Sequence, residues 1–237
     1  LLPLFYFARK NSSPQKLGKT HFYGKVLLKT CTNGSSELMT NLSSSIVNSL
    51  YNLQLMKFAG ENGVAAYGTI MYVNFIFVAI FIGYSIGSAP IISYHYGAQN
   101  HDELKNLSKK SLTLICIWAV SIFALAQLLA APASKLFVGY DQSLYKMTVS
   151  GFRIYCLAFL INGYNIFGSS FFTALNNGPI SAAISFLRTL VFQLSAVLLL
   201  PVILGINGIW LSVAVAELFT LCVTATFFIR KSKYYHY

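Results

Sequence analysis

Residues 62–100 read NGVAAYGTIMYVNFIFVAIFIGYSIGSAPIISYHYGAQN, a run that contains no Asp, Glu, Lys or Arg. A helix needs about 20 consecutive apolar residues to cross the hydrocarbon core of a bilayer, and this run is long enough. A soluble domain would need charge to cover its surface, and charge is absent here over a whole helix length. The run therefore predicts a membrane-spanning helix.

The whole chain has the composition of an integral membrane protein. Of its 237 residues, 56% are hydrophobic and 10% charged, and the mean hydropathy is +0.61, whereas a soluble domain has about 25% charged residues. The formal net charge of +11 does not indicate a nucleic-acid partner, because the basic residues stand between apolar runs, as membrane topology requires. The expected surroundings are the lipid bilayer.

Six segments are long enough to span, with approximate limits 33–57, 65–90, 109–131, 149–174, 183–204 and 207–229. Turn residues mark several ends, among them Ala131-Pro132-Ala133 after the third segment. The predicted fold class is an all-α integral membrane protein with a six-helix bundle at 31–230. Residues 1–30 are interpreted as the end of a preceding helix plus a basic linker, which would make the chain a fragment, and residues 231–237 as a tail.

The distribution of basic residues predicts the orientation in the membrane. Six of the 17 Lys and Arg residues precede residue 30, three lie at 105–110 and three at 230–233. With six spans, these three segments all lie on one side, and only Lys57, Lys135 and Lys146 lie near the opposite loops. Cytoplasmic loops carry an excess of Lys and Arg. Both ends are therefore predicted to be cytoplasmic, in a multi-pass protein of the plasma membrane.

The first predicted span carries a polar stripe. At about 100° per residue, its polar side chains fall within roughly 80° of one helix face, and leucine and isoleucine occupy the opposite face. The stripe consists of Glu37, Asn41, Ser44, Asn48 and Asn52. Because an unpaired amide or hydroxyl is costly in hydrocarbon, the stripe must face other helices or water. Two interpretations stay open: hydrogen bonding between helices, or the wall of an aqueous cavity.

Glu217 lies about 15 Å along its helix from Asn207, close to the bilayer midplane. A carboxylate at that depth suggests function by default, here the uptake and release of a proton as a cavity alternates between the two sides. The alternative is a structural ion pair with Arg188 of the preceding span or with Arg153.

Four further residues interrupt the apolar segments. Asn162 and Asn165 lie in mid-span with a glycine near each, which would allow close helix contact or a bend. Pro90 lacks an amide donor and is predicted to bend the second span, and Gly97 is predicted to end it.

Enzyme chemistry has no support in the sequence. The four cysteines lie far apart, and the histidines lack the spacing and carboxylate partners of a metal site. There is no Ser/His/Asp order and no phosphate-binding glycine loop. We therefore expect no enzyme activity, no cofactor and no metal site.

Five motifs, in order, resemble the MATE multidrug and toxin extrusion transporters. They are GSSELMTNLSSSIVNSLYN from Gly34, GENGVAAYGTI from Gly60, GSAPIISYHYGAQN from Gly87, FRIYCLAFLINGYNIFGSSFFTALNNG from Phe152, and SFLRTLVFQLSAVLLLPVILGINGIWLSVAVAE from Ser185. The resemblance implies one lobe, the C-terminal one, of a twelve-helix transporter with two lobes. Its partner would be an N-terminal six-helix lobe outside this chain. It also implies multidrug efflux, in which small organic cations are exported by alternating access, driven by inward Na⁺ or H⁺.

The resemblance extends to individual residues only in part. Some family members have a carboxylate in the middle of helix seven and another in helix ten, whereas here Glu37 lies near the start of helix seven and helix ten has no acid. The implied cleft is lined by Glu37, Asn41, Asn48, Asn162 and Asn165. Glu217 and the basic residues Arg153 and Arg188 would stabilise the lobe or couple to its movement.

Two alternatives remain at this stage. A lipid-linked saccharide flippase of the same superfamily should show more basic side chains in its cleft than Arg153 and Arg188. A membrane bundle that transports nothing would need no polar stripe along a whole span.

Overall fold

The structure is a computed structural model that describes residues 22–235 and 237, and every regular element in these residues is a helix. The chain divides into two units, of which the second is Thr32–Tyr237. The described residues 22–31 of the first unit are exposed, and residues 24–31 are helical. Most of the segment interpreted as the end of a preceding helix and linker, residues 1–21, lies outside the described residues. The second unit contains the candidate site.

The helices follow one another with short connections. They are α2 (Gly24–Gly97), α3 (His101–Val138), α4 (Gln142–Tyr155), the 3₁₀-helix η1 (Cys156–Ala158), α5 (Phe159–Ala174), α6 (Gly178–Phe186), the π-helix η2 (Leu187–Gln193), α7 (Leu194–Leu204) and α8 (Ile206–Tyr235). Because α4, η1 and α5 are continuous, as are α6, η2 and α7, the described residues form five helices long and apolar enough to cross a membrane.

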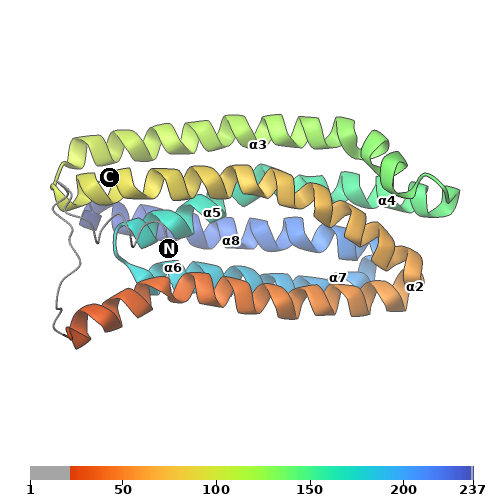
Figure 1. The fold of residues 1–237 in the computed structure, drawn as a ribbon, viewed down its shortest axis with the longest axis horizontal. Coiled ribbons are helices and arrows are strands. Elements are labelled where there is room, and N and C mark those ends of the chain that lie inside the picture. The colour runs from red at the N-terminus through yellow and green to blue at the C-terminus, as the bar shows by residue number, and fades with distance from the viewer. Residues whose placement is uncertain (1–21, 236) are drawn as a thin grey trace, which may run out of the picture. The chain divides into compact units, whose positions relative to one another are not determined.

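The sequence predicts six spans and the described structure has five such helices because α2 contains two of the spans. At Gly60 the backbone leaves helical geometry, with φ 63° and ψ −152°. Glycine adopts this conformation freely because it has no Cβ. Figure 1 shows the result: within α2 the chain reverses its direction between the orange and the yellow part. We call residues 32–59 the first arm and residues 61–97 the second arm of α2.

Capping residues determine several helix ends. Asp141 accepts hydrogen bonds from the amides of Ser143 (2.7 Å) and Leu144 (3.0 Å) at the start of α4, and Asn177 accepts from Ile180 at the start of α6. The prediction that the third span ends at Ala131-Pro132-Ala133 does not hold for the helix, because α3 continues to Val138. A proline removes only one donor, and a long apolar helix can continue through it.

The end of α2 contains the two residues predicted to bend and to end the second span. Pro90 lies inside the helix, and Gly97 is its last residue. The residue with a positive φ after this end is Gln99 (φ 54°). A hinge at Pro90 and Gly97 stays a prediction.

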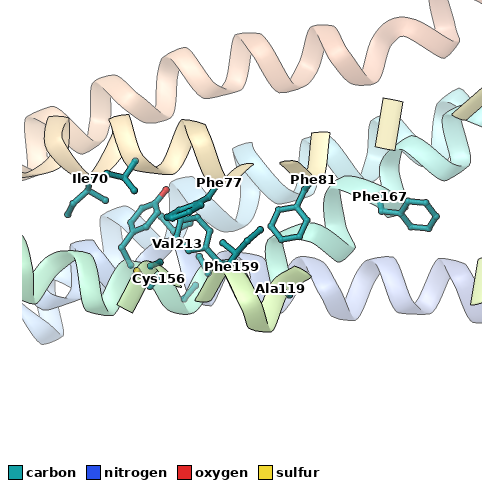
Figure 2. Close-up of a cluster of buried hydrophobic side chains, with 14 of the residues drawn as sticks. Ile70, Phe77, Phe81, Ala119, Cys156, Phe159, Phe167 and Val213 are labelled. Carbon is teal, nitrogen blue, oxygen red and sulfur yellow. The ribbon is translucent and has the colours of Figure 1, made fainter. Parts of the chain in front are cut away.

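Aromatic residues fill the core between the second arm and α5. The rings of Phe77 and Phe159 meet edge to face with centroids 5.4 Å apart, and both lie in the cluster shown in Figure 2. Gly163 makes room for Phe81, because a Cβ at position 163 would lie 2.5 Å from the Phe81 ring. Helix α8 packs against α4, α5, η2 and α7, which places the middle of α8, including Glu217, in the interior of the bundle.

Candidate functional site

A buried ion pair joins η2 and α8. Nε and Nη2 of Arg188 donate to Oε1 of Glu217 at 2.9 and 2.6 Å. The Glu217 side chain is 5% exposed and that of Arg188 21%. Burying one such charge alone would be costly, whereas the pair has no net charge. Of the two possible partners of Glu217, Arg188 is thus the one that pairs with it. Arg153 is exposed on α4.

Two asparagines of α5 complete the hydrogen bonding of the pair. Nη2 of Arg188 donates to Oδ1 of Asn162 at 2.7 Å, and Nδ2 of Asn165 donates to Oε2 of Glu217 at 2.7 Å and to its backbone oxygen at 2.9 Å. Thr224 of α8 donates to Oδ1 of Asn165 at 3.0 Å, which fixes the orientation of that amide. We call these five residues the charge network. It joins α5, η2 and α8 at one point.

The backbone around Arg188 is a feature that sequence reasoning missed. Residues 187–193 form a π-helix between two α-helical segments, and such short π segments are frequent at functional sites. The local sequence, LRTLVFQ, shows only an apolar run with one arginine. No residue pattern in it distinguishes a π-helix from an α-helix, so only the three-dimensional structure identifies this element.

In the described part of the chain, no hydrogen bond of the charge network involves Asn41, Asn48 or Asn52 of the polar stripe. Asn41, Asn48 and Asn52 are exposed. The buried face of the first arm is formed by Ser43, Val47, Tyr51 and Leu55. The structure therefore separates the predicted cleft residues into two sets: Asn162 and Asn165 are buried beside the ion pair, and the asparagines of the stripe lie on the surface of the lobe. Glu37 belongs to the first arm, but its side chain lies outside the described part of the structure.

Arg153 lies away from both sets. It lines a shallow depression of about 380 Å³ on α4 together with Lys146, and its backbone oxygen accepts a hydrogen bond from Gln127 of α3 at 3.0 Å. Within the residues that the structure describes, no three His, Cys, Asp or Glu side chains are grouped as a metal ion would require.

Gly168 of α5 leaves room for Thr224, a residue of α8 that belongs to the charge network. A Cβ at this position would lie 2.4 Å from Cγ2 of Thr224, so Gly168→Ala should turn Thr224 and weaken its bond to Asn165. We expect a loss of about 1–3 kcal/mol of stability, as for other overpacked cores, measured by thermal unfolding in detergent. Gly87→Ala is the matched control, since nothing lies within 4 Å of that added Cβ. Equal stability of the two variants would contradict the prediction.

A bundle of helices long and apolar enough to cross a membrane, with an ion pair and hydrogen-bonded asparagines in its interior, has the architecture of a multi-pass membrane protein. The model of one protein family, MatE, matches residues 38–199, well over half of the chain. The chain belongs to the MatE family of membrane transporters.

Solved structures show the same fold. A MATE protein in complex with MaL6 matches with a TM-score of 0.90 and 17% identity, over 99% of this chain and 53% of that one. A MOP superfamily transporter from Pyrococcus furiosus matches with a TM-score of 0.89 and 16% identity, over 100% and 54%. The outward-facing conformation of a multidrug resistance MATE family transporter matches with a TM-score of 0.84 and 18% identity, over 92% and 49%.

These similarities define the fold, and the chain spans about half the length of the structures it matches. The search of curated proteins gave no match.

Proposed function

We propose that this chain is the C-terminal lobe of a cation-coupled antiporter that exports small amphipathic organic cations across the plasma membrane by alternating access. The observation that carries this proposal is the match of the MatE family to residues 38–199. In the proposal a second six-helix lobe completes the transporter, both ends of this lobe are cytoplasmic, and inward Na⁺ or H⁺ supplies the driving force.

The exposed face of the first arm is the proposed wall of the substrate cleft. Asn41, Asn48 and Asn52 present amides on the outside of a helix that is apolar enough to cross a membrane. Exposure of several amides to hydrocarbon would be costly, so this face is better suited to a water-filled cleft opposite the other lobe. Glu37, on the same stripe, would supply a carboxylate for a cationic substrate.

The charge network is the proposed point at which movement of the lobe is controlled. It ties together α5, η2 and α8, so a rearrangement of any one of these elements must alter its hydrogen bonds. Coupling ion and drug would compete by favouring opposite-facing states, and each can shift that equilibrium only by its difference in affinity for the two states.

Efflux from cells tests this function directly. The full-length gene is expressed in a strain that lacks its own drug pumps, and loss of ethidium fluorescence is followed under an imposed Na⁺ gradient and, separately, an imposed pH gradient. We expect one of the two gradients to accelerate efflux above that of the empty vector. If neither gradient drives export of any organic cation tested, the proposal of a multidrug antiporter fails.

One observation favours a second candidate, a lipid-linked saccharide flippase. Lys146 and Arg153 share a depression on α4, and two cations could receive a pyrophosphate, whereas Arg188 is neutralised by Glu217. Replacing both Lys146 and Arg153 by alanine separates the candidates. For an antiporter of organic cations we expect ethidium efflux within about twofold of the unmodified protein, since exposed charges contribute little to stability. Loss of lipid-linked saccharide flipping, in a protein that exports no cation, would support the flippase.

A further inference from the structure

Tyr51 is a buried tyrosine of the first arm that the proposed function does not yet use. It is 1% exposed, and its hydroxyl lies 2.5 Å from Oγ of Ser212 on α8.

The direction of this hydrogen bond follows from the number of protons available. Ser212 has one hydroxyl proton and donates it to the backbone oxygen of Ile209 at 2.6 Å. The Tyr51 hydroxyl must therefore donate to Ser212. Removal of the Tyr51 oxygen breaks this bond and leaves the Ser212 oxygen without its donor.

The Ser212 partner of Tyr51 lies on the helix that carries Glu217, five residues before it. Helix α8 also packs against η2, which presents Arg188 to Glu217. One hydroxyl thus joins the first arm to the helix that holds the carboxylate of the Arg188–Glu217 pair.

The other face of Tyr51 leads to the polar stripe. Its ring stacks on that of Tyr67 in the second arm, with centroids 5.1 Å apart and planes 7° from parallel. The Tyr67 hydroxyl donates to Oδ1 of Asn48 at 2.9 Å, and Asn48 lies on the exposed face of the first arm. A continuous set of contacts therefore runs from the exposed stripe to α8, the helix that carries Glu217.

We propose that Tyr51 is a positioning residue that couples the exposed face of the first arm to the Arg188–Glu217 pair. While its hydroxyl holds Ser212, α8 keeps Glu217 against Arg188 and η2 stays π-helical. When the first arm moves, this bond breaks, α8 shifts against η2, and η2 can convert to an α-helix. Because each residue of an α-helix turns by about 100°, such a change of register would rotate Arg188 away from Glu217. This inference rests on the proposed function for its role in transport, but its structural part can be tested without transport.

Amide hydrogen exchange of the full-length protein in nanodiscs tests the structural part. Tyr51→Phe keeps the ring and removes only the hydroxyl. We expect exchange of residues 187–193 to become about fivefold faster or more, as for the loss of a buried hydrogen bond. Ser212→Ala removes the same bond from the opposite side and should act in the same direction. Unchanged exchange of residues 187–193 in both variants would overturn the proposal, whether or not the protein transports ethidium.

Tyr84→Phe is the matched control. The Tyr84 hydroxyl also donates one hydrogen bond between helices, to Ser111 of α3 at 2.9 Å, but neither the second arm nor α3 contributes to the charge network. We expect Tyr84→Phe to leave exchange of residues 187–193 as in the unmodified protein. If Tyr84→Phe accelerates it as much as Tyr51→Phe, the effect is a general loosening of the bundle, and the positioning role is refuted.

Transport separates positioning from a general loss of structure. In proteoliposomes we expect Tyr51→Phe to export less ethidium per coupling ion than the unmodified protein, by about threefold or more, at a melting temperature equal to that of Tyr84→Phe. An unchanged ratio in a transporting protein would overturn the coupling role of Tyr51 and leave the antiporter proposal intact. An unmodified protein that exports nothing would instead contradict the antiporter proposal, and the exchange result would still decide the structural role of Tyr51.

Discussion

Glu217→Ala is expected to destabilise the protein by about 3–5 kcal/mol and to abolish efflux. The substitution leaves the guanidinium of Arg188 without its carboxylate in a bundle interior, and it also removes the acceptor of Asn165. Because an arginine cannot lose its proton, the protein has no inexpensive way to remove the buried charge. Thermal unfolding in detergent measures the first effect, and ethidium efflux from cells that contain equal amounts of folded protein measures the second.

Glu61→Ala is the matched control, because Glu61 is an exposed carboxylate at the start of the second arm. We expect a change of stability within about 0.5 kcal/mol for this surface position. Similar melting temperatures for Glu217→Ala and Glu61→Ala would contradict the importance of the buried pair. Glu217→Gln keeps the shape and removes the charge, and transport by this variant at the parental rate would remove the charge of Glu217 from the mechanism.

The second large effect is expected from Arg188→Met, alone and combined with Glu217→Leu. Alone, Arg188→Met leaves the Glu217 carboxyl group without its cation but with the hydrogen bond from Asn165, so its cost should be smaller than that of Glu217→Ala. The combination removes both charges and fills the space with apolar side chains. Such replacement of a buried ion pair is often neutral or stabilising, so we expect the double variant to be more stable than either single variant.

The double variant distinguishes a structural from a mechanistic pair. If it regains a near-parental melting temperature and still fails to export ethidium, the pair acts in transport. If stability and efflux both return, the pair serves the fold alone and its proposed role in coupling is refuted. Arg153→Met is the matched control for the arginine, since Arg153 is exposed, and we expect it to change stability by less than about 0.5 kcal/mol.

Much of the fold could be predicted from composition and local pattern. Charge-free runs of spanning length identify the membrane class, and turn and capping residues such as Asp141 and Asn177 mark helix starts, because these signals act within a few residues. The reversal near Gly60 agrees with the two separate spans predicted at 33–57 and 65–90, whereas the continuation of α3 through Pro132 was not predicted.

The candidate site, like the fold, could be predicted from the sequence only in part. Sequence alone identified Glu217, Arg188, Asn162 and Asn165 as polar groups at membrane depth, because each is costly in hydrocarbon and so needs a partner. It left open whether Glu217 pairs with Arg188 or Arg153, and it placed the two asparagines with the stripe of the first arm. Only the tertiary structure decided that they bind the ion pair.

By itself, the sequence determined that this protein crosses the membrane in helices and carries charge inside them, since hydrophobicity and the cost of a buried polar group are properties of single residues and short segments. The tertiary structure decided which groups contact one another: the ion pair, the π-helix that presents Arg188, and the Tyr51 hydroxyl that joins the first arm to α8. The physical reason is that a hydrogen bond requires its atoms to approach within about 3 Å, and residues from α2, α5, η2 and α8 meet at that distance only in the folded bundle.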